Sequence, residues 1–316
     1  MSQQRIPLWI NVGVIPLVNL LMAFAVSGLL FYYIDINPLD AVNVMWQGAF
    51  GYAEGIGFTL YYATGFIFTG LAVAVAYHAG LFNIGGEGQA YVGGLGVGLV
   101  CLWFGDKLPL VLLLPLAAIA GGLFGAAWAF IPAYLQAKRG SHIVITTIMF
   151  NFIASSLMAY LLVDVLKPAS TMAPESAVFA EASWLPKIHS VLGLIGIDMP
   201  DSPVNVSLLW ALLCAVFVWV FLWYTRWGYQ IRSVGANVQA ASYAGISYSK
   251  VTIMAMALSG MLAGFFALNV IQGELHQIKL NYVEGFGFTG IAVALMGRNH
   301  PIGVILASLL FGFLYQ

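Results

Sequence analysis

Nine apolar stretches, separated by short polar connections, follow one another along almost the whole of this sequence. Most of them approach or exceed the roughly 20 residues that a helix needs to cross a bilayer. A β-barrel would instead show short strands of alternating polarity. The stretches occupy residues 9–34, 57–77, 86–104, 109–136, 141–166, 206–225, 251–272, 284–297 and 301–316. The sequence therefore predicts an all-α fold, a polytopic transmembrane helical bundle, with 284–297 as a broken or partial span.

The composition excludes several classes of protein. Hydrophobic residues make up 61% of the 316-residue chain and charged residues only 7%, whereas a soluble domain carries about 25% charged residues. A soluble enzyme is therefore excluded, and the lipid bilayer is the expected surrounding. The net charge of −1 leaves no basic surface for a nucleic acid. Cys101 and Cys214 lie within apolar stretches, so neither a disulfide framework nor a metal site is predicted from them.

The charges of the connections predict the orientation of the chain. Basic residues without acidic ones mark residues 226–250, while the 167–205 segment carries a net charge of −2. Because cytoplasmic loops are enriched in Lys and Arg, we expect 226–250 and the N-terminus to be cytoplasmic and 167–205 to be an extracytoplasmic loop. Residues 1–316 are interpreted as a single transmembrane domain. The last stretch stops at Gln316 without a charged flank, so we expect the natural protein to continue with a tenth segment.

No catalytic motif is present. The sequence lacks H-E-x-x-H, G-x-S-x-G and G-x-x-x-x-G-K-[ST] patterns, which mark zinc proteases, serine hydrolases and phosphate-binding loops. No catalytic residue, metal ligand or cofactor is predicted for this chain. If this chain works with ATP, a partner protein must bind the nucleotide.

Two groups of polar residues interrupt the apolar stretches. Asn83, Glu87 and Gln89 lie in the glycine-rich segment 80–89, and Glu87 either faces a cavity in the membrane or begins a helix in a solvated cytoplasmic turn. Thr147, Asn151 and Ser155 recur every four residues, so they share one face of a helix. Such a stripe either holds helices together or lines a hydrated path for a neutral solute. All six are candidate residues of a substrate pathway.

The basic connection contains a candidate docking helix. Asn237 is a good N-cap residue, and Gly245 is suited to end a helix in the left-handed conformation. Between them, Ala240, Ala241 and Ala244 would give the helix a flat face. The alternative is an ordinary surface helix between two spans.

Residues 81–89 (LFNIGGEGQ), 140–151 and 232–246 (RSVGANVQAASYAGI) together carry a family resemblance. From about residue 40 to its end, the chain resembles the permease subunits of bacterial ABC importers for nucleosides and simple sugars. These belong to the branched-chain-amino-acid/ribose-type superfamily, and the most similar branch is fed by basic-membrane-protein-type lipoprotein receptors. Gln239, Ala240, Ala241 and Gly245 fit the family's E-A-A-x-x-x-G pattern, although Gln239 replaces its acidic residue. Ile143 stands where the family often has glutamate.

The resemblance implies a set of partners and a location. Cytoplasmic ABC ATPase subunits would bind the ATP and contact a coupling segment that includes Gly235, Asn237, Gln239, Ala240, Ala241 and Gly245. A second permease, identical or different, and an extracytoplasmic solute-binding lipoprotein would complete the importer in the bacterial inner membrane. The sequence thus favours an ABC importer permease for a nucleoside or simple sugar. The alternative is a stand-alone, ion-coupled secondary transporter of a small polar solute; an intramembrane enzyme is disfavoured.

Overall fold

The computed structural model describes residue 7 and residues 9–193, 196 and 200–316. Within these residues the chain is helical, with isolated β-bridges in place of a sheet. The all-helical fold is therefore confirmed. The chain divides into two compact units, Met1–Tyr52 and Ala53–Gln316, and each is described by itself.

The first unit consists of an apolar helix followed by a more polar one. The π-helical turn η1 (Ile10–Val14) runs into α1 (Ile15–Tyr33), which has no buried residue and coincides with the first apolar stretch. The second helix, α2 (Pro38–Phe50), was not predicted, because its Asp and Asn residues interrupt the apolar pattern. It begins where the side chain of Asn37 accepts a hydrogen bond from the Leu39 amide at 3.1 Å, which is an N-cap.

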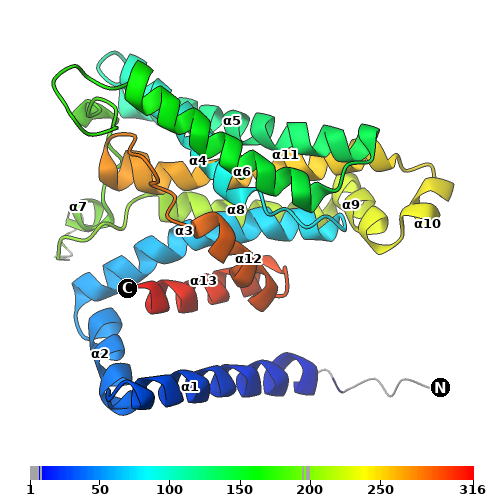
Figure 1. The fold of residues 1–316 in the computed structure, drawn as a ribbon, viewed down its shortest axis with the longest axis horizontal. Coiled ribbons are helices and arrows are strands. Elements are labelled where there is room, and N and C mark those ends of the chain that lie inside the picture. Colours follow the sequence, from blue (N-terminus) through cyan, green and yellow to red (C-terminus); the bar gives the residue numbers. More distant parts are fainter. Residues whose placement is uncertain (1–6, 8, 194–195, 197–199) are drawn as a thin grey trace. The chain divides into compact units, whose positions relative to one another are not determined.

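The second unit contains the remaining helices (Figure 1). They are α3 (Ala53–His78), α4 (Gly86–Phe104), α5 (Leu110–Arg139), α6 (Ile143–Tyr160) with its π-helical extension η2 (Leu161–Val165), η3 (Glu181–Ser183), α7 (Ile188–Gly193), α8 (Ser207–Tyr224), α9 (Arg226–Ala236), α10 (Val238–Tyr243), α11 (Tyr248–Ala267) with its π-helical extension η4 (Leu268–Leu275), α12 (Phe286–Met296) and α13 (Pro301–Tyr315). Every predicted apolar stretch of this unit contains a helix.

Six helices of the described chain are long and apolar enough to cross a membrane: α1, α3, α5, α6 with η2, α8, and α11 with η4. The shorter apolar helices are α12 and α13. Helix α4, whose first turn contains Glu87 and Gln89, is not among the six. The prediction of nine or ten membrane segments is therefore not confirmed and stays a prediction.

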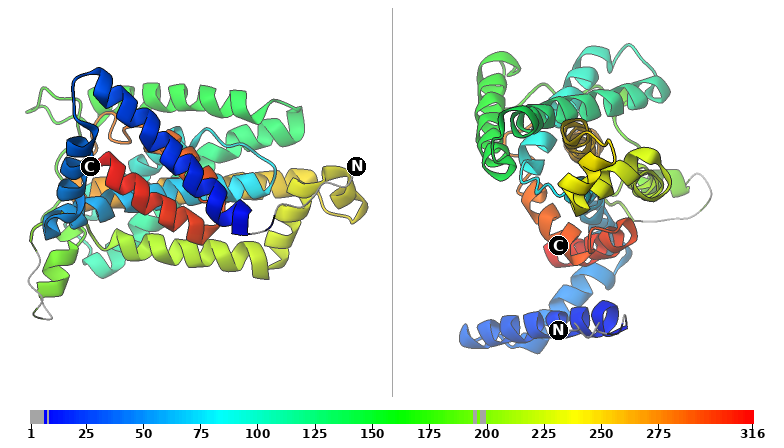
Figure 2. Two further views of the ribbon diagram at one scale, coloured as in Figure 1. Left: turned by 90° about the horizontal axis from the view of Figure 1, so that it is seen from below. Right: turned by 90° about the vertical axis from the view of Figure 1, so that its right-hand side faces the viewer.

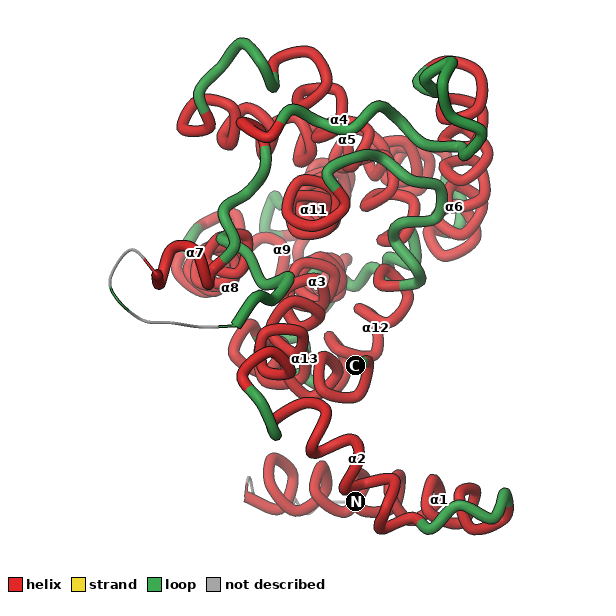
Figure 3. The backbone as a smooth tube through the Cα atoms, turned by 90° about the vertical axis from the view of Figure 1, so that its left-hand side faces the viewer, coloured by secondary structure: helices red, strands yellow, loops and turns green. Residues whose placement is uncertain are grey.

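Helix α11 lies at the centre of the second unit, between α3 on one side and α4 and α5 on the other (Figure 3). The side chains of Phe66 and Leu71 on α3 and of Phe266 on α11 are all fully buried. Burial on all sides explains why α3 and α11 are apolar around their whole circumference.

Glycines allow α11 to approach α5 closely. A side-chain carbon added at Gly264 would overlap the carbonyl oxygen of Gly121, and one added at Gly125 would overlap that of Gly260. Small residues that let two backbones touch are the usual basis of helix association in membranes. Gly121 and Gly125 stand four residues apart, the G-x-x-x-G spacing that is typical of such packing.

The connecting segments gather at two opposite ends of the second unit. Helices α9 and α10 lie at one end, and α7 lies at the other (Figures 1 and 2). The segment that contains α7 is joined to the chain between η4 and α12 by the bridge of Glu175 with Lys279. The two predicted loops, 167–205 and 226–250, are thus at opposite ends of the helices.

Candidate functional site

The chain between α3 and α4 turns back into the bundle instead of staying at its end. Asn83 and Gln89 form a reciprocal amide pair, with N···O distances of 2.9 and 3.1 Å. Asn83 also donates to the hydroxyl of Ser259 on α11 at 2.9 Å, and Ser259 donates to the carbonyl of Ala72 at 2.6 Å. Because Ala72 lies within α3, these bonds hold the turn inside the helical bundle.

Helix α6 supplies a polar side chain that forms hydrogen bonds with backbone groups at the start of α4. The Asn151 side chain accepts a hydrogen bond from the Gly88 amide and donates one to the Ile84 carbonyl, both at 2.9 Å. Amides in the first turn of a helix have no partner within the helix, so Asn151 supplies one. Thr147, one turn earlier, is fully buried, and its hydroxyl donates to the Ile143 carbonyl of its own helix at 2.8 Å.

Glu87 joins the first turns of α4 and α12. Its two carboxylate oxygens accept hydrogen bonds from the backbone amides of Gly285, at 2.9 Å, and Gly287, at 2.8 Å. A side chain at Gly287 would overlap the backbone of Glu87, so the glycine is needed for the two helices to meet. A carboxylate is favoured at a helix N-terminus by the exposed amides and the helix dipole.

From this meeting point the two helices run toward opposite ends of the unit. The far end of α4 reaches the loop that precedes α7, where Gly105 lies against Ser183. The turn after α12 reaches the end of α3, where the imidazole Nε2 of His78 is 3.0 Å from the Asn299 carbonyl. Two helices therefore begin inside the bundle with their positive ends facing Glu87. Interrupted helices whose ends point at a polar site are typical of membrane transporters.

A cavity of about 230 Å³ opens beside Glu87. We call it the polar cavity. It is lined by Glu87, Gly88, Tyr91, Asn151, Ser155, Asn281, Val283, Glu284 and Gly285. Its carboxylates, amides and hydroxyls can exchange hydrogen bonds with a neutral polar solute.

The structure brings together some of the predicted pathway residues and places others behind them. Those on the wall of the polar cavity are Glu87, Asn151 and Ser155. Those buried outside the wall are Asn83, Gln89 and Thr147. Glu87 lies in the first turn of α4 and also lines the polar cavity, so both alternatives for this residue stay open. The role of all six residues in solute passage stays a prediction.

Sequence reasoning missed the chain between η4 and α12. Asn281 and Glu284 line the polar cavity and have left-handed backbones, with φ of 59° and 50°. The Tyr91 hydroxyl accepts a hydrogen bond from the Asn281 amide at 2.7 Å and so fixes this chain against α4. The signal that pointed here was the shortness of the 284–297 stretch, because a helix of 11 residues rises only about 16 Å, roughly half of a bilayer's hydrocarbon core.

The short helix predicted after Asn237 is present as α10. The Asn237 side chain caps it by accepting from the Ala240 amide at 2.9 Å, and Gly245 follows it with φ of 77°. Ala240 and Gln239 are exposed, whereas Ala241 is buried and faces the bundle. Gly235 packs against the carbonyl of His78, where a larger residue would not fit. Which of these residues contact a partner stays a prediction.

Comparison with known proteins identifies the family of the chain. Residues 55–316 match the model of a family described as the permease component of the branched-chain amino acid transport system. The chain belongs to this permease family. Several apolar helices and family membership together identify a multi-pass membrane protein. Within the described residues, no group of three or more His, Cys, Asp or Glu side chains is arranged to hold a metal ion.

The chain is also similar to individual permeases. It is 35% identical to a glucose ABC transporter permease protein of Haloferax volcanii over 99% of this chain and 82% of the relative. It is 34% identical to a guanosine ABC transporter permease protein of Bacillus subtilis over 94% of this chain and 83% of the relative. It is 33% identical to a nucleoside ABC transporter permease protein of Lactococcus lactis over 95% of this chain and 82% of the relative. No solved structure matches the chain.

Proposed function

We propose that this permease moves a nucleoside or a simple sugar inward through the polar cavity, driven by ATP hydrolysis in a separate subunit. The observation that carries the proposal is the meeting of α4 and α12 at Glu87, beside a cavity lined by Asn151 and Ser155. Relatives at 33–35% identity are permeases for glucose, guanosine and nucleosides. A neutral solute in this cavity would replace its water hydrogen bonds with hydrogen bonds to the protein.

The proposal includes the partners of the permease. ABC ATPase subunits would contact α10, with Gly235, Asn237, Gln239, Ala240, Ala241 and Gly245 in the coupling segment. A second permease and an extracytoplasmic solute-binding lipoprotein would complete the importer. The exposed surface of α10 and its place at one end of the bundle support the ATPase contact (Figure 2), since a partner outside the membrane can reach it.

The proposed location is the cytoplasmic membrane, with the N-terminus and residues 226–250 in the cytoplasm. The basic residues of 226–250 and the acidic balance of 167–205 support this orientation. The two segments lie at opposite ends of the second unit, as that orientation requires. Nine or ten membrane segments, with α4, α12 and α13 included, complete the proposed topology.

Reconstitution tests the proposed energy source. The chain purified alone and placed in liposomes is expected to take up neither labelled guanosine nor labelled glucose under a proton or sodium gradient. Addition of the cognate ATPase, partner permease and solute-binding lipoprotein should give uptake that requires ATP. Gradient-driven uptake by the chain alone would instead show an ion-coupled secondary transporter.

A further inference from the structure

A second cavity, of about 210 Å³, lies on another side of the chain between η4 and α12. We call it the aromatic cavity. Its walls include the rings of Phe58, Tyr61, Tyr62 and Phe286 and the carboxyl groups of Glu274 and Glu284. Glu284 also lines the polar cavity, so one side chain borders both spaces.

The aromatic wall is supported from behind. Phe286 stacks on the fully buried Phe66, with ring centroids 4.4 Å apart and planes 18° from parallel. Tyr62 faces Phe286 with centroids 6.4 Å apart and an interplanar angle of 29°. Phe286 is itself buried and supports Tyr62, whose half-buried ring presents a π-face that suits a flat heterocycle.

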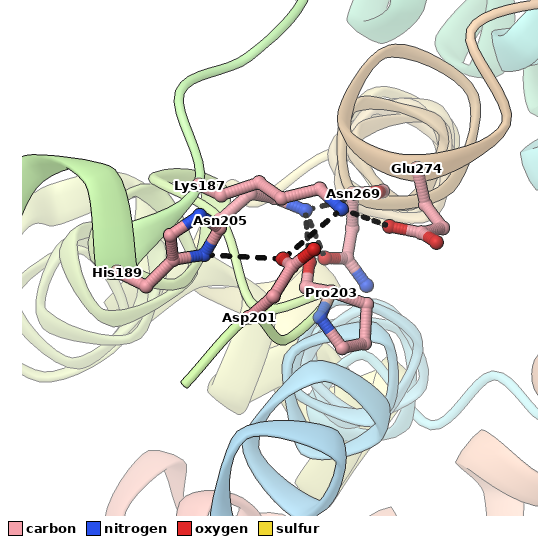
Figure 4. Close-up of polar contacts among 7 residues, drawn as sticks. All are labelled: Lys187, His189, Asp201, Pro203, Asn205, Asn269 and Glu274. Carbon is pink, nitrogen blue, oxygen red and sulfur yellow. Dashed lines mark hydrogen bonds and ion pairs between the residues drawn. The ribbon is translucent and has the colours of Figure 1, made fainter. Parts of the chain in front are cut away.

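A polar cluster contributes three residues to the lining of this cavity: Pro203, Asn269 and Glu274 (Figure 4). The ammonium nitrogen of Lys187 lies 3.6 Å from a carboxylate oxygen of Glu274 and 3.7 Å from a carboxylate oxygen of Asp201. The Asn205 side chain donates to Asn269 on η4 at 3.2 Å. These contacts hold Pro203, which lines the aromatic cavity, against η4. The lining of the cavity therefore combines aromatic rings with the Asn269 amide and the carboxylates of Glu274 and Glu284.

The backbone at Glu284 is strained. Its φ of 50° is left-handed, a conformation that is uncommon for a residue other than glycine. Such conformations are energetically unfavourable and persist where the surrounding structure enforces them, often at ligand-binding sites. Here the conformation places the one carboxylate that borders both cavities.

We propose that the aromatic cavity is a binding station for the base ring of a nucleoside, and that Glu284 binds the sugar hydroxyls where the two cavities adjoin. The inference rests on the proposed transport function and names which of its two solute classes the chain accepts. The base stacks on the ring of Tyr62, and the hydroxyls donate hydrogen bonds to the carboxylate. A simple sugar lacks the flat heterocycle that this ring would hold.

Photolabelling of the wild-type protein in its native membranes tests the site directly. With 8-azidoguanosine as the probe, the labelled peptides should contain residues 58–62 of α3 or residues 282–286. Excess guanosine should prevent the labelling, and excess glucose should not. Label confined to α6 near Asn151 and Ser155, equal protection by glucose, or no label in membranes that transport guanosine would overturn the inference.

A variant pair sharpens the test. Tyr62→Leu removes a ring and keeps an apolar side chain, so labelling by 8-azidoguanosine should fall about tenfold, as expected for the loss of one base–aromatic stack. Tyr134→Leu is the matched control, because Tyr134 lies on α5 and lines neither cavity; its labelling should equal that of wild type. Unchanged labelling in Tyr62→Leu would overturn the inference. If the reconstituted importer moves glucose but not guanosine, the permease proposal stands and this inference falls.

Discussion

The Glu87 carboxylate accepts a hydrogen bond from the backbone amide of Gly287, with an N···O distance of 2.8 Å, although the two residues are 200 positions apart in the sequence. This contact brings the start of α4 against the start of α12 inside the bundle. Its second oxygen binds Gly285 in the same way, at 2.9 Å. The backbone amides at the start of α12 have no acceptor within their own helix. The two carboxylate oxygens of Glu87 thus serve as their acceptors.

Glu87→Gln should lower the stability of the purified protein, because an amide offers only one acceptor oxygen to the two backbone amides. Hydrogen bonds to charged groups contribute about 1.5–3 kcal/mol, and partial exposure of Glu87 places the expected loss at the lower end of that range. A fall in the melting temperature in detergent measures the effect. Glu54→Gln, at an exposed position in the first turn of α3, is the control and should change little. Equal melting temperatures for the two variants would show that the contact contributes no stability.

Asn151→Leu should reduce solute uptake while leaving membrane assembly intact. Leucine has similar bulk, but it can neither accept the hydrogen bond from the Gly88 amide nor donate one to the Ile84 carbonyl. Asn151→Asp keeps the acceptor and loses the donor, so its uptake should lie between that of Asn151→Leu and that of wild type. Initial uptake rates, corrected for the amount of protein in the membrane, provide the measurement. Wild-type uptake by Asn151→Leu would exclude this side chain from the solute pathway.

Gly245→Leu should abolish the coupling of solute to ATP hydrolysis. The position has φ of 77° and open space around it, so leucine strains the backbone by about 1 kcal/mol and adds volume at the proposed contact. Gly140→Leu is a matched control, since Gly140 has φ of 71°, equally open surroundings and a position outside the coupling segment. Solute-stimulated ATPase activity should be lost in the first variant and kept in the second. If both variants keep it, the residues around Gly245 only connect two helices.

The pH response of His276 offers a further prediction. Its ring stacks on Trp184 with centroids 3.8 Å apart. Burial, together with the positive charge of Lys187, lowers the pKa of His276 below its usual value. The folded state therefore binds fewer protons than the unfolded state, so stability is full above about pH 6.5 and declines as the pH falls below it. The melting temperature measured between pH 7.5 and 5 should fall less in His276→Gln than in wild type. An identical pH dependence in the two proteins would contradict this.

The helices could be predicted from the sequence, but the cavity between them could not. Hydropathy marks the apolar stretches because a helix in contact with lipid must carry apolar side chains. Helix α2 was not predicted because its polar residues interrupt the apolar pattern. Spacing by four residues correctly placed Thr147, Asn151 and Ser155 on one side of α6. Their surroundings differ, however, since Thr147 is buried and Ser155 is exposed. That difference depends on where distant segments pack, as does the position of Glu284.

Thiol labelling at position 155 tests most directly whether the polar cavity is the solute path. In a background with Cys101 and Cys214 replaced by Ala, Ser155→Cys should react with a water-soluble thiol reagent, and the transported solute should slow the reaction. Met149→Cys and Ile153→Cys, at exposed positions of α6 that do not line the cavity, should stay unreactive because they face lipid. Reaction of the variants at 149 and 153, with no reaction of Ser155→Cys, would contradict the assignment of the polar cavity as the path.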